Sequence, residues 1–435
     1  MFRGNQLLYT IDSNFVYSFF GSTSVSSIDS NSASSSRRTF VQGLGLALTG
    51  AGSVPALAQA AEVKVGFLLP LTGSFAESGQ LIKMAVEMAI DEINASGGIK
   101  SLKGAKLVGV FGNSTSVDEA NTETNRMISR DKVSAIVGAY SSGATISSTV
   151  IAERNKIPYL VPNALADEIT SRGLKFVFKT VPHFSQYAIN SGELVRQLSG
   201  GKAKTFALVR ENNFFGNVVS REFTKHMPTF DLKMTKDNVF PTNPTTFEDV
   251  ILSLKRDNPD VVFAAGEPSS ITLLFKQLAE LKYWPKMGWV GLGGGYTNPT
   301  TWSNLGKLGD GVIVINDWFP DMKLPGSKET NERFKKRSGG KDMLGNANTT
   351  YAGVHILRAA LEKAASTDGT AIRNALAGLD LVLGPQTFMY ERVKFDDTGF
   401  MPRTTMVAAQ VTQAGSKVIW PSAYQTTKPV WPVTR

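Results

Sequence analysis

Short apolar runs alternate with amphipathic stretches along the chain from about residue 62 onward. After the first run, VKVGFLLP (63–70), a polar turn leads into a stretch where apolar residues from Ile82 to Ile93 recur at helical spacing. Three further runs follow, each after a helical stretch: KLVGVFGN, VSAIVGAY and IPYLVPN (106–113, 133–140 and 157–163). Because strands separated by helices pair in parallel, this pattern predicts a doubly wound α/β sheet.

The same alternation starts again near residue 204. The second set of apolar runs is KTFALVREN, LKMTKDNVF, PDVVFAAGE and MGWVGLGG (204–212, 232–240, 259–267 and 287–294). A third stretch adds the run DGVIVINDWF (310–319), further helices, and two apolar segments joined at Gly415-Ser416 that predict antiparallel strands. A chain of 435 residues with two such sets is expected to form two Rossmann-like lobes with parallel central sheets.

Residues 1–60 have the pattern of an export signal. Arg37 and Arg38 precede a mildly apolar, Gly-rich run that ends in small residues around Ala58 and Ala60. This order is typical of a cleavable secretory signal, and SRRTFV (36–41) resembles the twin-arginine motif. A single membrane anchor is the alternative, but four glycines interrupt the run. We expect a soluble periplasmic protein without a lipid anchor, because the chain has no cysteine, and we hypothesise that its start is over-extended.

Composition narrows the candidate chemistry. The formal net charge is +9, but Lys and Arg are spread along the whole chain, so we expect no nucleic-acid partner. Such a basic surface is expected to draw anionic small molecules toward a cleft. The absence of cysteine excludes disulfides and thiolate metal sites, and the three histidines (His183, His226 and His355) lack ligand spacing. No metal site is expected.

Five turns after predicted strands are candidates for ligand contact. In an open α/β sheet, ligands meet the carboxyl ends of strands, where helix N-termini offer unpaired N–H groups. The candidate turns are Leu71 to Ser74, Tyr140 to Gly143, Asn163 to Asp167, Asn213 to Gly216 and Gly266 to Ser269. Two interpretations of Ser141 and Ser142 stay open: they cap a helix, or they present hydroxyls and N–H groups to a ligand carboxylate.

A serine nucleophile is the competing interpretation of the second turn. A Gly-x-Ser-x-Gly elbow is absent, because Ala139 stands two residues before Ser141 and the pattern also fails around Ser142. His355, the candidate base late in the chain, lies in a helical stretch with an apolar face. The glycine-rich segment GLGGGYTNP (291–299) lacks the ending of either phosphate-binding motif. We therefore expect no catalytic residue, no enzyme activity and no cofactor.

Several segments taken together resemble one known family. They are VKVGFLLPLTGSFAESG, AIDEINASGGI, the stretch from IVGAYSSGATISS to GLKFVFKT, NNFFG, PDVVFAAGE and GWVGLGGGYTNPTTWSNLGKLGDGVIV. From about Glu62 to the end, the chain resembles the solute-binding proteins of ABC transporters, in the branched-chain amino acid (Leu/Ile/Val) and amide group with the type I periplasmic-binding fold. The resemblance implies two lobes that are joined by three crossovers and close over a ligand as a hinged clamp.

The resemblance also implies where the lobes divide. The crossovers are expected near Val181 to His183, Asn316 to Pro320 and Gly384 to Gln386. The N-terminal lobe then comprises residues 62–182 plus 318–384, and the C-terminal lobe comprises 183–317 plus 385–435.

The turns and the resemblance together nominate a ligand-binding set. Ser141, Ser142 and the turn from Asn163 to Ala166 are implied to hold a ligand carboxylate, and Phe215 to pack against the ligand. Glu267 and the turn around Gly293 are implied to complete the second side. The full set is Ser74, Tyr140, Ser141, Ser142, Asn163, Ala164, Ala166, Phe215, Glu267 and Gly293.

One departure from the family pattern bears on the ligand. Amino acid binders of the family usually carry an acid in the turn that here reads Gly291-Leu292-Gly293-Gly294. Either Glu267 or Asp317 supplies that charge, or the ligand has no ammonium. Leu165, where the family tends to a hydroxyl, removes a donor. Both changes favour a ligand more apolar than a free amino acid, such as an aromatic or aliphatic carboxylate or an amide.

The expected function is that of a periplasmic receptor. It captures a small carboxylate- or amide-bearing solute between the lobes and delivers it to an ABC permease, and we expect it to act as a monomer. A ligand sensor for a signalling partner and an exported α/β hydrolase remain as alternatives.

Overall fold

The computed structural model describes residues 61–435 except 383, 385–389, 403–405 and 435. The predicted export signal at residues 1–60 therefore lies outside the described residues. All described residues belong to one compact unit of the chain. Among them, no helix is both long and apolar enough to cross a membrane.

The first sheet has five strands, all parallel, in the order β2-β1-β3-β4-β5. The strands are β1 (Glu62–Leu69), β2 (Lys106–Asn113), β3 (Ala135–Val137), β4 (Tyr159–Val161) and β5 (Val177–Lys179). The apolar runs of the sequence thus became parallel strands, as predicted.

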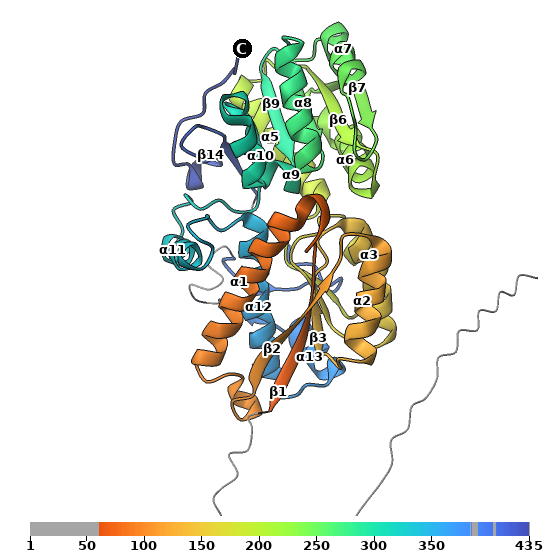
Figure 1. The fold of residues 1–435 in the computed structure, drawn as a ribbon, viewed down its shortest axis with the longest axis vertical. Coiled ribbons are helices and arrows are strands. Elements are labelled where there is room, and N and C mark those ends of the chain that lie inside the picture. Colours follow the sequence, from red (N-terminus) through yellow and green to blue (C-terminus); the bar gives the residue numbers. More distant parts are fainter. Residues whose placement is uncertain (1–60, 383, 385–389, 403–405, 435) are drawn as a thin grey trace, which may run out of the picture. The chain divides into compact units, whose positions relative to one another are not determined.

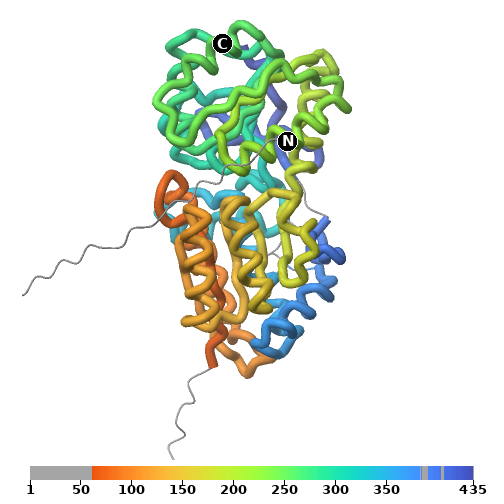
Figure 2. The backbone as a smooth tube through the Cα atoms, turned by 90° about the vertical axis from the view of Figure 1, so that its right-hand side faces the viewer, coloured from red at the N-terminus to blue at the C-terminus, as the bar shows by residue number. Residues whose placement is uncertain are grey.

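Helices cover both faces of this sheet. They are α1 (Ala76–Ala95), α2 (Val117–Ser129), α3 (Ser142–Arg154) and α4 (Glu168–Ser171), with α11 (Ser327–Arg337), α12 (Gly345–Ala364) and α13 (Gly369–Ala377) from late in the chain. In Figure 1, α1 and α12 lie on one side of β1 to β3, and α2 and α3 lie on the other. Figure 2 shows the late helices in blue beside the orange N-terminal elements.

The second sheet has seven strands in the order β14-β13-β10-β9-β8-β6-β7. Five are parallel: β6 (Thr205–Glu211), β7 (Lys233–Phe240), β8 (Val261–Ala265), β9 (Gly288–Leu292) and β10 (Ile313–Asn316). The other two, β13 (Val407–Gln410) and β14 (Lys417–Trp420), add antiparallel pairs at one edge. This confirms the antiparallel tail expected around Gly415.

The helices of the second set are α5 (Phe184–Ser199), α6 (Phe214–His226), α7 (Glu248–Asp257), α8 (Pro268–Glu280), α9 (Gly294–Thr297) and α10 (Pro299–Leu305). Every residue of β8 and β9 is buried. Parallel sheets bury both faces under crossover helices, so their central strands are continuously apolar rather than alternating.

The third crossover between the sheets lies later in the chain than the predicted position near Gly384 to Gln386. β11 (Asp380–Leu381) pairs with β12 (Val393–Lys394), and Phe395 packs edge-on against Phe178 of the first sheet at 5.1 Å between ring centroids. The N–H of Lys179 donates to the carbonyl of Gly399 at 2.8 Å, and the N–H of Met401 donates to the carbonyl of Lys179 at 3.0 Å. Backbone pairing with β5 keeps this segment on the first sheet, so the second-sheet part begins after Met401 and not at residue 385.

A glycine substitution tests this placement. Gly399 has φ +80°, and a Cβ there would lie 2.1 Å from the carbonyl oxygen of Val177. We expect Gly399→Ala to lose roughly 1–2 kcal/mol for the left-handed backbone and about 1–3 kcal/mol more for the clash. Gly415 also has positive φ but faces open space. Gly415→Ala should therefore lose only the roughly 1–2 kcal/mol of the left-handed backbone. Equal losses in urea unfolding would contradict the placement of residues 396–401.

Candidate functional site

The turns after the strands of both sheets line one cavity of about 540 Å³. The turns after β1, β2, β3 and β4 contribute from the first sheet, and those after β6, β7, β8, β9 and β10 contribute from the second. Tyr187 of α5, Asn346 near the start of α12 and Met406 complete the lining. The carboxyl ends of two parallel sheets thus meet at one polar space, which is where open α/β sheets bind ligands.

All residues that the sequence nominated except Ala166 line this cavity. Ala166 is fully buried, and its backbone N–H donates to Ser142 Oγ at 3.3 Å. It supports the turn after β3 and does not face the cavity, because its N–H is already directed at that hydroxyl.

The paired serines have structural partners. Ser141 is the N-cap of α3, and its Oγ accepts from the N–H of Ala144 at 3.3 Å. Ser142 is buried and holds the turn after β4 through the bond to Ala166. The capping interpretation is confirmed for Ser141 alone, and ligand contact by the pair stays a prediction. Each hydroxyl accepts one bond and keeps its own proton to donate. The next turn is held similarly, because the Asn163 amide is hydrogen-bonded to the hydroxyls of Thr349 and Thr350 at 3.1 and 2.9 Å.

Tyr140 directs an unpaired hydroxyl toward the cavity. Its oxygen is buried and has no hydrogen-bond partner among the described residues. Ser78 and Asn346 approach it without completing a hydrogen bond. Burial raises the pKa of the Tyr140 phenol above its usual range, and the charge of Glu267 adds to the shift. A neutral phenol of this kind can donate to or accept from a ligand.

Glycines in the turn after β9 leave no room for side chains. Gly293 has φ +78°, and a Cβ there would lie 2.9 Å from the Phe215 ring. A Cβ on Gly294 would lie 2.1 Å from Tyr140 Oη, and one on Gly291 would lie 2.0 Å from the ring of Tyr296. An acid in this segment would therefore require the ring of Phe215, Tyr140 or Tyr296 to move, because contacts under 3.0 Å force neighbouring atoms to shift.

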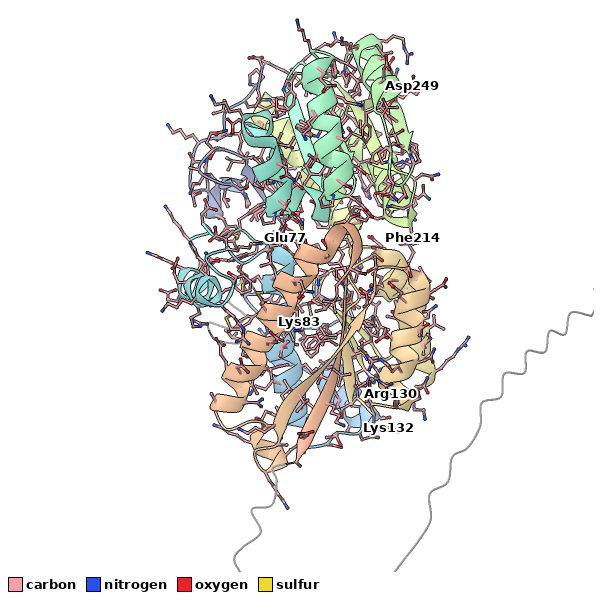
Figure 3. All side chains as sticks on the ribbon, in the orientation of Figure 1. Glu77, Lys83, Arg130, Lys132, Phe214 and Asp249 are labelled. Atoms are coloured by element: carbon pink, nitrogen blue, oxygen red, sulfur yellow. The ribbon has the colours of Figure 1, made fainter. Side chains whose placement is uncertain are left out.

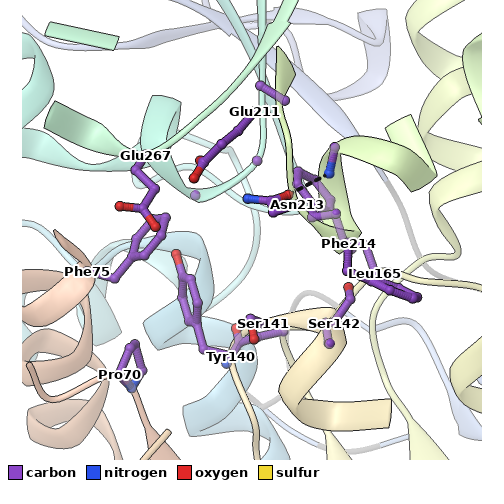
Figure 4. A pocket seen from close by; sticks show the side chains of 18 of the residues that line it. Pro70, Phe75, Tyr140, Ser141, Ser142, Leu165, Glu211, Asn213, Phe214 and Glu267 are labelled. Carbon is purple, nitrogen blue, oxygen red and sulfur yellow. Dashed lines mark hydrogen bonds between the residues drawn. The ribbon is translucent and has the colours of Figure 1, made fainter. Parts of the chain in front are cut away.

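Three carboxylates line the side of the cavity formed by the second sheet. Glu211 ends β6, Glu267 is the N-cap of α8, and Asp317 follows β10. Figure 4 shows Glu211 and Glu267 across the cavity from Ser141 and Ser142. Burial raises the pKa of Glu211, and the neighbouring charge of Glu267 raises it further. Burial also raises the pKa of Asp317, to about 7.

The described lining includes no Lys, Arg or His. The basic surface that we expected to draw anionic molecules toward a cleft therefore lies outside this described lining, and that expectation stays a prediction. Its aromatic side chains are Phe75, Tyr140, Tyr187, Phe214 and Phe215. Phe75 and Tyr140 pack at 5.1 Å between ring centroids. The charged side chains of the described lining are therefore all carboxylates, and aromatic rings lie among its hydroxyl, amide and glycine residues.

Several lining residues are missing from the nominated ligand-binding set. Glu211 ends β6, so the rule of strand carboxyl ends could have found it, and Asn213 stood in a candidate turn but not in the set. Tyr187 and Asn346 lie on helices far from any strand end, and no local pattern marks them. Asn213 caps α6 by accepting from the N–H of Gly216 at 2.8 Å. No group of three metal-ligating side chains occurs among the residues that the structure describes.

Two parallel sheets whose carboxyl ends share one polar cavity define the two-lobed class of α/β ligand-binding proteins. A family model described as "Periplasmic binding protein" matches residues 62–416. The chain belongs to this family.

Curated relatives match most of the chain. The Leu/Ile/Val-binding protein homolog 7 of Brucella suis is 30% identical over 390 residues, covering 86% of this chain and 94% of the relative. Homolog 8 of the same organism is 30% identical over 392 residues and covers 87% and 94%.

Solved structures share the fold. The branched-chain amino acid binding protein LivJ of Streptococcus pneumoniae, in complex with isoleucine, has a TM-score of 0.73 and 21% identity, covering 83% of this chain and 100% of LivJ. A solute-binding protein of R. palustris in complex with benzoate has a TM-score of 0.71 and 19% identity, covering 84% and 99%. These likenesses establish the type I periplasmic-binding fold.

Urea unfolding of the unliganded protein can test whether the Tyr140 hydroxyl lacks a hydrogen-bond partner. Tyr140→Phe should leave the free energy of unfolding unchanged or slightly higher, because no hydrogen bond is lost. Tyr159→Phe is the matched control, since Tyr159 Oη lies 3.0 Å from Ser148 Oγ, and it should lose roughly 1 kcal/mol. Urea unfolding measures both. A loss from Tyr140→Phe as large as that from the control would mean that the hydroxyl has a partner.

Asp317 should make stability depend on pH. Its pKa of about 7 in the folded state lies above the ordinary value of 3.8, so the folded state keeps a proton that the unfolded state has lost. Stability therefore falls as pH rises between these values, by at most about 1.4 kcal/mol per pH unit. Asp317→Asn should abolish this fall and be more stable than the wild type at pH 8.

Urea unfolding at pH 5, 6, 7 and 8 measures the dependence. Asp249→Asn controls for the loss of one negative charge, because Asp249 is exposed on α7. Parallel curves for the wild type and Asp317→Asn would contradict the prediction.

Proposed function

We propose that this protein is an extracytoplasmic receptor that captures a small organic solute between its two lobes and delivers it to an ABC permease. The observation that carries the proposal is the cavity itself. It is lined from both sheets by hydrogen-bonding side chains, turn backbone and aromatic rings. Such a surface holds a ligand by many contacts from opposite sides, and the proposed receptor makes or breaks no covalent bond.

One side of the cavity suits a ligand oxygen. Ser142 and Gly143 are the first residues of α3, so their N–H groups have no acceptor within the helix, and the helix dipole favours negative charge there. The hydroxyl protons of Ser141 and Ser142 and the phenol of Tyr140 add further donors. We propose that a carboxylate or amide oxygen binds at this helix end.

Contacts outside the cavity support closure of the lobes. Asn298, before α10, donates from Nδ2 to Ser78 Oγ of α1 at 3.0 Å, and Thr300 donates to Glu77 of α1. These bonds join elements beside different sheets. A side-chain hydrogen bond contributes about 1 kcal/mol net, so we propose that these bonds form on closure and break on release.

The names of the relatives support a solute-binding role. Proteins of similar fold are described in complex with isoleucine and with benzoate, and curated relatives are named for Leu/Ile/Val binding. We extend to this chain only the shared part, a small solute with a carboxylate or related polar head. A sensor for a signalling partner would use the same cavity.

A thermal screen tests the proposal. Amino acids, amides and aromatic acids are added to the protein, and a ligand at about 100 times its dissociation constant should stabilise it by roughly 2.7 kcal/mol. Replacing Ser141 and Ser142 together by Ala should abolish the shift in melting temperature.

A second helix-cap variant distinguishes the loss of ligand contact from the loss of a helix cap. Asp368 caps α13 by accepting from the N–H of Ala371 at 2.9 Å, so Asp368→Ala also loses about 1 kcal/mol of stability but should keep the ligand shift. Turnover of generic esters, or small-angle scattering that never changes with any stabilising compound, would contradict the receptor proposal.

A further inference from the structure

The cavity carries negative charge that nothing in its described lining balances. Glu211, Glu267 and Asp317 line it, and no Lys, Arg or His does. The chain as a whole is basic, with a formal net charge of +9, so this local excess of acid runs against the composition.

Glu211 has a carboxylate oxygen without a partner. The residue is 3% exposed, and its Oε2 is buried without a hydrogen bond among the described residues. Figure 4 shows its side chain directed into the cavity, on the same side as Glu267. Thr242, Asn213 and the N–H of Glu267 approach this carboxylate without completing a hydrogen bond to Oε2. Burial disfavours an ionised carboxylate that is not paired and hydrogen-bonded, so a donor from a ligand would stabilise it.

Asp317, just after β10, also has an unpaired carboxylate oxygen. Its Oδ1 is buried without a hydrogen-bond partner among the described residues, and it lines the same cavity. The hydroxyl oxygens of Ser114 and Tyr140 are also buried and unpaired in this lining, but each can donate its own proton. The carboxylate oxygens of Glu211 and Asp317 are therefore the two that need a donor when ionised.

The nearby cations of the protein are already engaged. Arg210 precedes Glu211 on β6 and donates to Asp237 at 2.9 Å and to Asn217 at 2.9 Å. Successive side chains of a strand point to opposite faces, so Arg210 is directed away from the Glu211 carboxylate. Lys179 donates from Nζ to the carbonyls of Leu165 and Ala166 at 2.7 and 3.3 Å. These two cations therefore do not balance the carboxylates of the cavity, and a cationic ligand can.

Resting on the proposed receptor function, we propose that the ligand is a small organic cation, a solute with a protonated amine or guanidinium and a neutral polar head in place of a carboxylate. Its N–H groups donate to Glu211, Glu267 and Asp317. Phe75 and Tyr140 offer ring faces that attract the cation, and an amide oxygen suffices for the N-terminus of α3. An organic cation is favoured over a metal ion, because no metal-ligating group of three side chains occurs among the described residues.

Two sets of four matched compounds measure the effects of the ammonium and of the carboxylate on binding separately. L-Leucine carries both, L-leucinamide keeps the ammonium, 4-methylpentanoate keeps the carboxylate, and 4-methylpentanamide has neither. L-Phenylalanine, L-phenylalaninamide, 3-phenylpropanoate and 3-phenylpropanamide form the same set on an aromatic side chain. Isothermal titration at pH 7 measures the dissociation constant of each.

L-Leucinamide and L-phenylalaninamide, the amides that keep the ammonium, should each bind most tightly in their set. Losing one partner of a desolvated charge pair typically costs 2–5 kcal/mol, so we expect each to bind at least about tenfold more tightly than its deaminated amide. We expect each also to bind more tightly than the free amino acid, whose carboxylate adds negative charge to an acidic space.

Variants connect the preference to these residues. Glu211→Gln and Glu267→Gln keep the size of each side chain and remove its charge, and each should reduce the preference for the ammonium by about tenfold. Asp249→Asn removes a charge at the far end of the second-sheet elements from Phe214, as Figure 3 shows, and should leave the preference unchanged. Circular dichroism and the melting temperature establish that each variant is folded.

The outcomes distinguish the two proposals. If 4-methylpentanoate or 3-phenylpropanoate binds as tightly as the matching amide that keeps the ammonium, the cation inference is wrong and the receptor function stands. If the free amino acids bind more tightly than their amides, the inference is also wrong. If none of the eight compounds binds, the cation inference is wrong, and the receptor function is decided by the thermal screen and small-angle scattering.

Discussion

Parallel strand pairing is the constraint on which the site depends. In a parallel sheet, every crossover returns the chain to the same starting edge, so all strand carboxyl ends and the following helix N-termini lie at the opposite edge. The first sheet places the turns after β1 to β4 there, and the second places those after β6 to β10 there. The central strands need an apolar sequence, whereas the turns between them remain free to vary. Binding chemistry therefore concentrates in a few short segments far apart along the chain.

Most of these segments must first stabilise the fold. Ser141 and Asn213 cap helices, and Ser142 joins two turns through the N–H of Ala166. These roles fix the side chains before any ligand arrives, which lowers the entropy lost on binding. The glycines after β9 act differently, since their lack of a Cβ lets Phe215 and Tyr140 approach the backbone. An acidic side chain in that turn would displace these rings, and the carboxylates of the cavity lie instead at the end of β6, at the N-cap of α8 and just after β10.

The electrostatics of the cavity differ from those of the whole molecule because screening depends on depth. Surface charges farther apart than about 8 Å hardly interact at physiological salt, so the net charge of +9 says little about a cavity. Buried groups interact through less water, and there Glu267 contributes to the raised pKa of Glu211. A cationic ligand would lower the pKa of Glu211 by stabilising its ionised carboxylate. The unpaired carboxylate oxygens of Glu211 and Asp317 and the lack of basic residues in the described lining would then have one common cause.

The sequence by itself determined the α/β class, the two sets of strands and most turns that meet at the cavity. Apolar runs and helical periodicity are local properties, and parallel pairing then dictates which ends of the strands lie together. The sequence alone misplaced the third crossover, because the pairing of Gly399 and Met401 with Lys179 joins residues more than two hundred positions apart. It also missed Tyr187 and Asn346, which reach the cavity from helices. Only tertiary structure decided which polar groups lie buried without partners, because burial and charge balance depend on segments that come together when the chain folds.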